Sequence, residues 1–376
     1  MRAGRRRLTP RAKTSSKRAI LAGTTMADSG EAEILFERRG ALGLVTLNRP
    51  RALNALTLAM LTAMQAQLDA WAGDAAVTRV VLRGRGGRAF CAGGDIRQIH
   101  ALATAGDHAG VDAFWRAEYG LDASVKRFAK PVISLIEGLV MGGGNGISVH
   151  GSHRVSSETY SFAMPEVGIG LFPDVGMTYV LPRLPGLTGT YLALTGARIG
   201  PGDAHAVGLA THHAPAGDFD ALVEALAEGA AVDAVLADHA RPVPEPGVLV
   251  AERARIDACF AADTVGQILA RLDADGSAFA AETAALMRTR SPTSLTLVRE
   301  QMRRGATLSF PQAMLTEYRM VSALMRGPDF FEGVRAAVID KDGAPAWNPA
   351  TLDGVEPGTI AAAFAPGPAP EPRFDP

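Results

Sequence analysis

The chain has 376 residues, of which 47% are hydrophobic and 20% charged, enough to bury a large core in one or two domains. No apolar run reaches the roughly 18 to 20 residues of a membrane-spanning helix, so no transmembrane segment is expected. The formal net charge is -1, but eight basic residues and no acid lie in residues 1–25, so the remainder is acidic and a nucleic-acid partner is not expected.

The N-terminal leader and the cysteines bear on the compartment. Residues 1–30 are interpreted as a basic leader outside the fold and are expected to be disordered. The leader is either a transit peptide, an unstructured tail, or the result of a start assigned upstream of Met26. A transit peptide would place the protein in the mitochondrial matrix, whereas a bacterial source would place it in the cytoplasm. The two cysteines, Cys91 and Cys259, match no metal-ligand spacing, which argues against a metal site or a disulfide framework.

The first elements alternate between strand and helix. Residues 34–48 hold two short β-rich runs around a glycine, which predicts a hairpin. Apolar residues at helical spacing follow Asn54, which is predicted to cap that helix. A strand at 80–83 then leads into a turn with five glycines in residues 84–94.

A second strand with a second glycine-rich turn continues this pattern. The strand is predicted at 132–137, the turn is GLVMGGGNG, and the segment after it reads as a helix. A further strand and turn follow through residues 154–174. Strands that alternate with helices predict an α/β core, assigned to residues 31–215. Residues 216–348 read as a mainly helical C-terminal region and 349–376 as a tail, with the closing GPAPEPRFDP expected to be disordered.

The two glycine-rich turns suggest a site for a developing negative charge. A reaction at a carbonyl group builds charge on its oxygen, and two backbone N–H groups can stabilise that charge. Glycine lets the backbone approach a substrate closely, so the turns around Gly94 and Gly143 could each supply one donor if they lie side by side. Tight turns without any function are the alternative. A dinucleotide fingerprint fails, because its last position would fall on Ile147 or Val149.

Two carboxylates, Glu166 and Asp174, lie in the otherwise apolar stretch SFAMPEVGIGLFPDVG. Each follows a proline, so both also fit the role of a turn or cap residue. A buried charge without a partner costs several kcal/mol, so a functional role for the pair is the competing interpretation.

Five motifs together resemble the crotonase superfamily of acyl-CoA enzymes. They are NRPRALNAL from residue 48, RAFCAGGDI from 88, KPVISLIEGLVMGGGNG from 130, SFAMPEVGIGLFPDVG from 161 and FFEGVRAAVIDKD from 330. The resemblance implies stacked ββα units with a helical C-terminal region. It also implies an oxyanion hole formed by the N–H groups of Gly94 and Gly143, with CoA held near residues 51–52 and 92–96.

The branch that the chain resembles is the 3-hydroxyisobutyryl-CoA hydrolases. Shared segments include SVHG, FAMPE, GLFPDVG, LPRL, LALTG, SPTSL and the run from Met325 to Ala336. A hydratase resembling this chain would carry a second catalytic glutamate where Gly146 stands, which puts water addition by two glutamates in doubt. At positions 177 and 178 the chain has Met and Thr where the branch often has more glycine.

The resemblance gives each candidate residue a role. Glu166 would act as nucleophile or general base, Asp174 would bind the hydroxyl group of the acyl chain, and Glu118 would contact the substrate. The substrate-binding set is then Glu118, Gly143, Glu166 and Asp174. His150 is interpreted as a structural histidine, and Cys91 as a packing residue rather than a nucleophile.

The expected activity is therefore hydrolysis of the 3-hydroxyisobutyryl-CoA thioester, with CoA as part of the substrate and no separate cofactor. Two alternatives stay open: a hydratase or isomerase of the same superfamily, and a non-catalytic acyl-CoA binding protein. The oligomeric state is also left open, since related proteins often form homo-oligomers.

Overall fold

The computed structural model describes residues 31–367 and 370–374. The leader predicted at residues 1–30 lies outside the described residues. The strands are β1 (Ile34–Arg39), β2 (Leu42–Leu47), β3 (Arg79–Gly84), β4 (Ala89–Cys91), β5 (Val132–Ile136), β6 (Leu139–Met141), β7 (His153–Ser156), β8 (Ser161–Ala163) and β9 (His212–His213).

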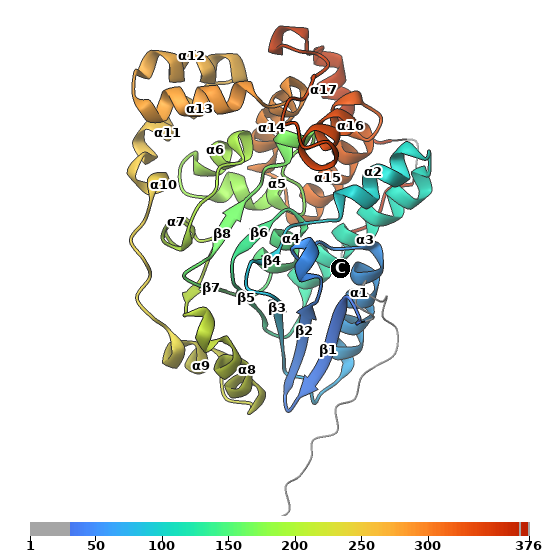
Figure 1. Ribbon diagram of the computed structural model, residues 1–376, viewed down its shortest axis with the longest axis vertical. Coiled ribbons are helices and arrows are strands. Elements are labelled where there is room, and N and C mark those ends of the chain that lie inside the picture. The colour runs from blue at the N-terminus through green and yellow to red at the C-terminus, as the bar shows by residue number, and fades with distance from the viewer. Residues whose placement is uncertain (1–30, 368–369, 375–376) are drawn as a thin grey trace, which may run out of the picture.

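The strands form two sheets (Figure 1). The larger sheet has the order β1-β2-β3-β5-β7-β9, with β1 and β2 antiparallel and the other neighbours parallel. The smaller sheet, β4-β6-β8, is parallel throughout. Three times the chain passes from the larger sheet directly to the smaller one, from β3 to β4, β5 to β6 and β7 to β8. This repeated pair of strands confirms the predicted α/β fold with stacked ββα units.

The helices of the first half accompany these strands: α1 (Leu58–Gly73), α2 (Ile96–Thr104), α3 (His108–Arg127), α4 (Gly143–Val149), α5 (Met177–Val180), α6 (Thr188–Thr195) and α7 (Pro201–Ala206). The later helices are α8 (Phe219–Ala227), α9 (Val232–His239), α10 (Val248–Ala251), α11 (Arg253–Phe260), α12 (Val265–Asp275), α13 (Ala278–Arg288), α14 (Pro292–Gly305), α15 (Phe310–Leu324), α16 (Pro328–Val334) and α17 (Pro357–Ala363). Among the described helices, none is long and apolar enough to cross a membrane.

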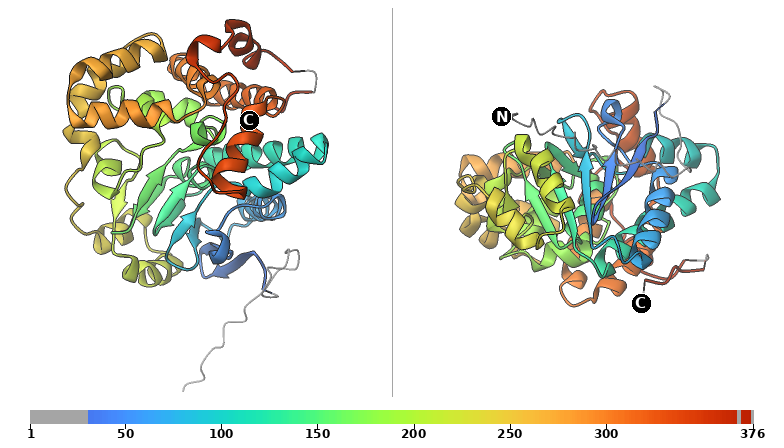
Figure 2. Two further views of the ribbon diagram at one scale, coloured as in Figure 1. Left: turned by 45° about the horizontal axis from the view of Figure 1, so that its top comes forward. Right: turned by 90° about the horizontal axis from the view of Figure 1, so that it is seen from below.

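Apolar side chains lie on both faces of the larger sheet, so helices pack on each side (Figure 2). Buried residues of β2, β3, β5 and β7 pack on one face against Phe219, Leu222 and Leu226 of α8. The other face belongs to the main core, which includes α1, α3 and most of the C-terminal helices. Runs such as VISLI in β5, buried at every position, are typical of a parallel strand covered on both faces.

The structure corrects the predicted cap of α1. The side chain of Thr57, not Asn54, accepts the hydrogen bond from the N–H of Met60 and caps the helix. Asn54 instead has a φ of 58°, and its amide group donates to the carbonyl oxygens of Arg85 and Ala89. Asparagine tolerates this left-handed backbone better than most residues, so Asn54 holds the turn before the helix.

The C-terminal region predicted at residues 216–348 is mainly helical as expected, while its limits at residues 216 and 348 stay a prediction.

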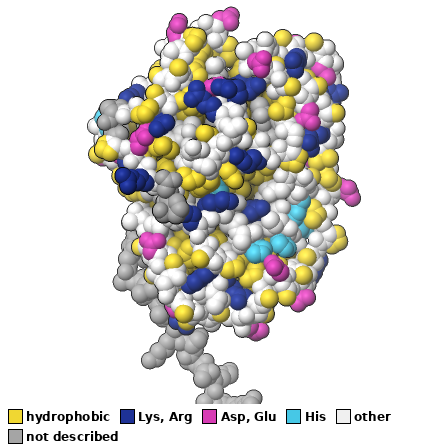
Figure 3. Space-filling model, turned by 180° about the vertical axis from the view of Figure 1, so that it is seen from behind, with side chains coloured by type: hydrophobic (Ala, Val, Ile, Leu, Met, Phe, Trp, Pro, Cys, Tyr) yellow, Lys and Arg dark blue, Asp and Glu magenta, His cyan; other side chains and the backbone are white. Residues whose placement is uncertain are grey.

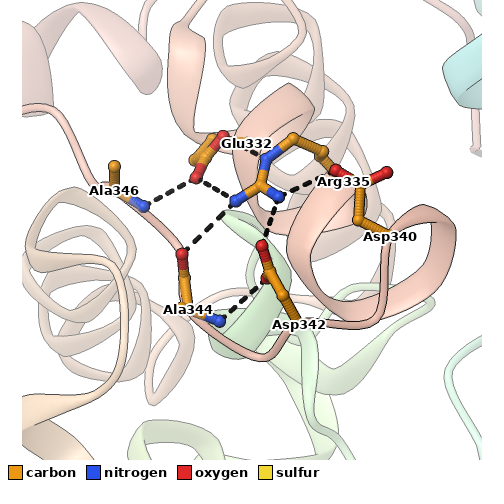
Figure 4. A network of polar contacts seen from close by, with 6 residues as sticks. All are labelled: Glu332, Arg335, Asp340, Asp342, Ala344 and Ala346. Atoms are coloured by element: carbon orange, nitrogen blue, oxygen red, sulfur yellow. Dashed lines mark hydrogen bonds and ion pairs between the residues drawn. The ribbon is translucent and has the colours of Figure 1, made fainter.

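Side chains of the FFEGVRA motif in this region hydrogen-bond to the segment that follows α16 (Figure 4). Arg335 donates to both carboxylate oxygens of Glu332, at 2.7 and 2.9 Å, and also pairs with Asp340 and Asp342. Glu332 in turn accepts from the N–H of Ala346 at 2.7 Å. These contacts give this part of the motif a structural role.

The expectation of a disordered end is wrong for residues 370–374. Phe374 is buried, and its carbonyl oxygen accepts a hydrogen bond from Arg127 of α3 at 2.6 Å. Glu371 forms a two-pronged ion pair with Arg319 of α15, at 2.7 and 2.9 Å. The segment is poor in apolar residues, but Phe374 contacts α3 and Glu371 pairs with α15, and these two contacts hold it in place.

The surface at the back of the molecule carries interspersed basic, acidic and apolar side chains (Figure 3). Histidines gather there beside an acidic side chain. The rings of His153 and His212 are 5.6 Å apart, and Nε2 of His153 lies 2.9 Å from a carboxylate oxygen of Asp233.

Candidate active site

The two glycine-rich turns lie against each other. The first follows β4, and the second connects β6 to α4. A Cβ atom added at Gly93 would lie 3.4 Å from the backbone nitrogen of Gly143, and one added at Gly143 would lie 3.3 Å from the nitrogen of Gly94. Gly93 has a φ of 100° and Gly142 a φ of 46°, a backbone conformation that glycine adopts readily. The close approach of the two turns therefore depends on glycine.

The backbone N–H groups of Gly94 and Gly143 have no acceptor within the described part of the chain. Gly143 is the first residue of α4, so its N–H is among those that a helix leaves without an intrahelical partner. The two turns therefore leave two donors close to each other without an acceptor among the described residues.

The segment expected to hold CoA after β2 lies next to the first glycine turn. The backbone N–H of Leu56 donates to the oxygen of Gly93 at 2.9 Å, and the N–H of Asp95 donates to the oxygen of Leu56 at 2.8 Å. Arg49 joins the two segments further, because its guanidinium group lies 3.0 Å from the carboxylate of Asp95. The structure therefore holds the residues on either side of 51–52, Arg49 and Leu56, against the segment 92–96.

Glu118 of α3 lies over both glycine turns. Its side chain is 1% exposed, and its Oε1 has no hydrogen-bond partner among the described residues. A Cβ atom added at Gly143 would lie 2.2 Å from this oxygen, and one added at Gly94 would lie 3.3 Å from it. Burial, and then the charges of Asp174 and Glu166, raise the pKa of Glu118 well above its ordinary value.

Glu166 begins a 3₁₀ turn that follows β8, which places its side chain at the second glycine turn. Its Oε1 lies 3.2 Å from the position that a Cβ atom at Gly142 would take, and its Oε2 is buried without a partner among the described residues. Burial raises the pKa of Glu166 well above its ordinary value, with a further contribution from Asp174. A carboxyl group held in such a dry position becomes a strong base or nucleophile once it loses its proton.

Asp174 lies in the loop before α5 and is held by a residue that the sequence analysis did not single out. The hydroxyl group of Tyr119, on α3, donates to Oδ2 of Asp174 at 2.9 Å. Burial raises the pKa of Asp174 to about 7, while the hydrogen bond from Tyr119 lowers it in part. Tyr119 directly follows Glu118, so one turn of α3 contributes to both parts of the site.

The loop that carries Asp174 is fixed by side chains from three helices. Val175 has a φ of 55°, which is rare for a β-branched residue and indicates strain next to Asp174. His150, the residue that ends α4 as its C-cap, lies with Nε2 2.8 Å from the oxygen of Val175, and since a carbonyl only accepts, Nε2 carries the proton. Burial lowers the pKa of His150 to about 4, so the ring is neutral and serves as a donor to this loop. This contact fits the structural role expected for His150.

The other two side chains that fix this loop were not predicted. Glu317 of α15 accepts from the backbone N–H of Gly176 at 2.7 Å and from that of Thr178 at 2.8 Å. Gln301 of α14 donates to the oxygen of Pro173 at 2.6 Å. No motif points to either residue, because both lie more than 120 residues after the loop in the sequence.

Cys91 packs beside the first glycine turn. It is fully buried, its thiol lies 3.8 Å from the oxygen of Gly93, and burial raises the pKa of the thiol to about 12. A thiol that stays protonated is a poor nucleophile, which agrees with the packing role expected from the sequence. Within the described residues, no group of three or more His, Cys, Asp or Glu side chains is arranged to hold a metal ion.

Five buried carboxyl groups surround this region without a basic partner. In the described part of the chain, none of the five carboxyl groups forms a salt bridge. The pKa of each is raised, and burial is the largest cause in every case. They are Glu118, Asp122, Glu166, Asp174 and Glu317. Like charges in a dry site cannot all ionise together, so the protonated form of these groups is favoured.

Comparison with known proteins places the chain in a family. The family model for enoyl-CoA hydratase/isomerase matches residues 42–364. The chain belongs to that family. It is 43% identical to the mitochondrial 3-hydroxyisobutyryl-CoA hydrolase of Danio rerio, over 91% of this chain and 92% of that protein. It is 45% identical to the corresponding mitochondrial hydrolase of Rattus norvegicus, over 86% of each chain.

A solved structure of the family shares the whole architecture. The crystal structure of a carnitinyl-CoA dehydratase from Mycobacterium thermoresistibile superimposes with a TM-score of 0.86 at 42% identity. The match covers 91% of this chain and 98% of that one. The crotonase-type fold of the chain is thereby confirmed, together with the recognition made from its motifs.

Proposed function

We propose that this chain hydrolyses the thioester of 3-hydroxyisobutyryl-CoA to free CoA and 3-hydroxyisobutyrate, a step of valine breakdown. Curated relatives with that name are 43% and 45% identical over most of the chain. The observation that carries the proposal is Glu166, buried beside the paired glycine turns while Gly146 offers no second carboxylate on α4. A carboxylate at the paired N–H donors, with no side chain at position 146 to act as a second glutamate, fits acyl transfer to water.

In the proposed reaction, the thioester oxygen accepts hydrogen bonds from the N–H groups of Gly94 and Gly143. As the carbonyl carbon is attacked, this oxygen gains negative charge that both donors stabilise. Losing one such donor typically costs roughly 2.7 to 4 kcal/mol of transition-state stabilisation. The carbon–sulfur bond then breaks, and the CoA thiolate takes up a proton.

Glu166 acts at the carbonyl carbon by one of two routes. As a nucleophile it forms a mixed anhydride, which water then cleaves to the hydroxy acid and the free carboxylate. As a general base it takes a proton from the attacking water directly. Both routes consume one water molecule and need no cofactor besides the CoA carried by the substrate.

Asp174 and Glu118 complete the proposed substrate site. Asp174 accepts a hydrogen bond from the hydroxyl group of the acyl chain, and its Oδ2 also accepts the hydrogen bond from the hydroxyl group of Tyr119. Glu118 contacts the thioester end, because its carboxyl group lies over both glycine turns. An unhydroxylated acyl chain would leave the buried Asp174 with an unused acceptor, at a cost of about 1 to 3 kcal/mol.

The test is to follow thiol release from 3-hydroxyisobutyryl-CoA for the wild type and for Glu166→Gln. We expect the variant to lose at least about 100-fold in kcat, the size of a positioned acid–base contribution, with little change in substrate binding. Glu228→Gln is the matched control, since Glu228 is exposed at the end of α8 and should leave turnover unchanged. Unchanged turnover in Glu166→Gln would exclude the proposed role.

The same assay separates the two alternatives. A hydratase would hydrate crotonyl-CoA rapidly without releasing thiol, and a non-catalytic binding protein would bind acyl-CoA without any turnover. The crotonyl-CoA assay is needed because one structural relative is named a carnitinyl-CoA dehydratase. Gly146 argues against two-glutamate water addition, since glycine cannot act as an acid or a base.

Compartment and assembly complete the proposal. The named relatives are mitochondrial, and the basic leader would take this chain to the mitochondrial matrix if it is a transit peptide. Fusing residues 1–30 to a fluorescent protein tests that role. Size-exclusion chromatography with light scattering tests whether the chain forms a homo-oligomer.

A further inference from the structure

Asp122 is a fully buried acid that the proposed reaction leaves unused. It lies on α3, is 0% exposed, and neither of its carboxyl oxygens has a hydrogen-bond partner among the described residues. Burying an acid without a partner is costly, so such a group is expected to meet a ligand or to remain as a strained feature of the site.

The carboxyl group of Asp122 fills the space above Gly146. A Cβ atom added at Gly146 would lie 2.5 Å from Oδ1, 2.7 Å from Oδ2 and 2.8 Å from Cγ of Asp122. Gly146 lies three residues after Gly143 on α4, so Asp122 reaches the helix that begins at the second glycine turn. An acid from α3 therefore occupies the place where a side chain at position 146 would begin.

Asp122 lies one helical turn beyond the residue that holds Asp174. Asp122 follows Tyr119 by three residues on the same face of α3, and Tyr119 donates its hydroxyl hydrogen bond to Asp174. The charges of Glu118, Asp174 and Glu317 act on Asp122, that of Glu118 most strongly. Burial, and then these charges, raise the pKa of Asp122 well above its ordinary value, which favours the protonated carboxyl group, the form that can donate a hydrogen bond.

A hydroxyl group needs a donor as well as an acceptor when it is buried. Its hydrogen can go to Asp174, but its oxygen still needs an N–H or O–H donor. The hydroxyl hydrogen of Tyr119 is already engaged with Asp174. Two acids of α3 have unpartnered carboxyl oxygens among the described residues, Glu118 and Asp122, and the proposed reaction assigns Glu118 to the thioester end.

We propose that Asp122 is a specificity-determining residue whose carboxyl group donates a hydrogen bond to the hydroxyl oxygen of a hydroxylated acyl chain, while Asp174 accepts from the same hydroxyl group. The assignment rests on the proposed function for the identity of the substrate. It makes the acyl end of the site a pair of acids, one donor and one acceptor. Such a pair favours hydroxylated chains over unhydroxylated ones, and the surrounding acids disfavour chains that end in a carboxylate.

The test measures binding rather than turnover. Two non-hydrolysable CoA thioether analogues are used, one with a 3-hydroxyisobutyryl-like chain and one lacking the hydroxyl group, and calorimetry gives each Kd. Asp122→Leu removes the donor and keeps the branched shape of the side chain, and we expect the preference for the hydroxylated analogue to fall about tenfold. Asp122→Asn keeps an N–H donor and should retain most of the preference. Asp112→Asn, on the same helix with its acid paired to Arg116, is the control and should match the wild type.

Each outcome bears on the assignment. If Asp122→Leu fails to fold, Asp122→Ala replaces it. A wild-type preference that persists in the variant without the donor would overturn the assignment, as would an equal loss of affinity for both analogues. A wild type without any preference would overturn it too. Thiol release, assayed in parallel, tests the proposed hydrolase activity separately. If the wild type prefers the hydroxylated analogue but releases no thiol, the proposed hydrolysis is contradicted while the assignment of Asp122 stands.

Discussion

At the scale of single residues, the site is built from acids and glycines that depend on one another. Glu118 lies over Gly94 and Gly143, and Asp122 lies over Gly146. In each pair a carboxyl group takes the space that a side chain on the glycine would fill. The absence of a side chain at position 146 is therefore a packing requirement as well as a missing catalytic group.

Replacing Gly146 by alanine tests this packing directly. The added Cβ would lie 2.5 Å from Oδ1 of Asp122, and both groups are buried. We expect Gly146→Ala to lower the free energy of unfolding by about 1 to 3 kcal/mol, the usual cost of an overpacked core. The same change in an Asp122→Ala background should cost much less, because the clashing carboxyl group is gone.

Urea denaturation of the four proteins in this double-mutant cycle gives the coupling between the two positions. Gly120→Ala is the control, because Gly120 lies inside α3 with no atom within 4 Å of its added Cβ. That substitution should stabilise the protein by about 0.5 to 1 kcal/mol through helix propensity. An equal cost of Gly146→Ala in both backgrounds would contradict the packing argument.

At the scale of elements, α3, α4, α14 and α15 converge on the loop at residues 173–178. His150, Gln301 and Glu317 each hold a different backbone group of that loop. The positive φ of Val175 persists because these contacts over-determine the loop. The loop is thereby held in place, and with it the carboxyl group that is proposed to select the acyl chain.

The pH dependence of stability tests the contribution of Glu317 to this loop. Burial raises its pKa from an ordinary value of 4.5 to about 8. A carboxyl group whose pKa is raised by folding contributes stability that is complete below pH 4.5 and is lost as the pH rises to about 8. For the wild type this loss is on the order of a few kcal/mol.

Glu317→Gln cannot titrate, so its free energy of unfolding should fall less than that of the wild type between pH 5 and 8. At pH 5 the variant should be less stable by about 1 to 3 kcal/mol, because glutamine offers one acceptor oxygen to two backbone N–H groups. Urea denaturation of both proteins across this range measures the difference. His150 titrates in both proteins, so parallel pH curves would show that Glu317 is not the cause.

The sequence predicted features that lie within short motifs, but not the contacts between residues far apart in the chain. The strands, the two glycine turns and the roles implied for Glu166 and Asp174 were read from short motifs. The cap of α1 was assigned to Asn54 instead of Thr57, because both residue types cap helices and only the backbone angle of Asn54 distinguishes them. Glu317 lies in a segment that was predicted only to be helical, and only the fold brings it to Gly176.

At the scale of the whole molecule, the C-terminal segment joins two helices that carry the site. Residues 370–374 contact Arg127 at the end of α3 and Arg319 on α15. The same helices carry Glu118 and Glu317. The chain thus closes its own fold by pairing its last described residues with elements far away in sequence.

Phe374 should dominate this contact. Its side chain is 4% exposed, and burying a phenylalanine contributes about 1.5 to 3 kcal/mol, whereas an ion pair as exposed as Arg319–Glu371 contributes about 1 kcal/mol at most. We expect Phe374→Ala to lower the free energy of unfolding by about 2 kcal/mol and Glu371→Gln by less than half of that. Arg373→Ala, at an exposed position, is the control and should have no effect on the free energy of unfolding.

The Phe374→Ala substitution should leave catalysis unchanged. Arg127 lies nine residues beyond Glu118, about 14 Å along α3, so kcat for thioester hydrolysis should stay the same in this variant below its unfolding temperature. Urea denaturation and thiol release on the same samples check both expectations, and a loss of kcat without a loss of stability would show that the segment shapes the site instead of closing the fold.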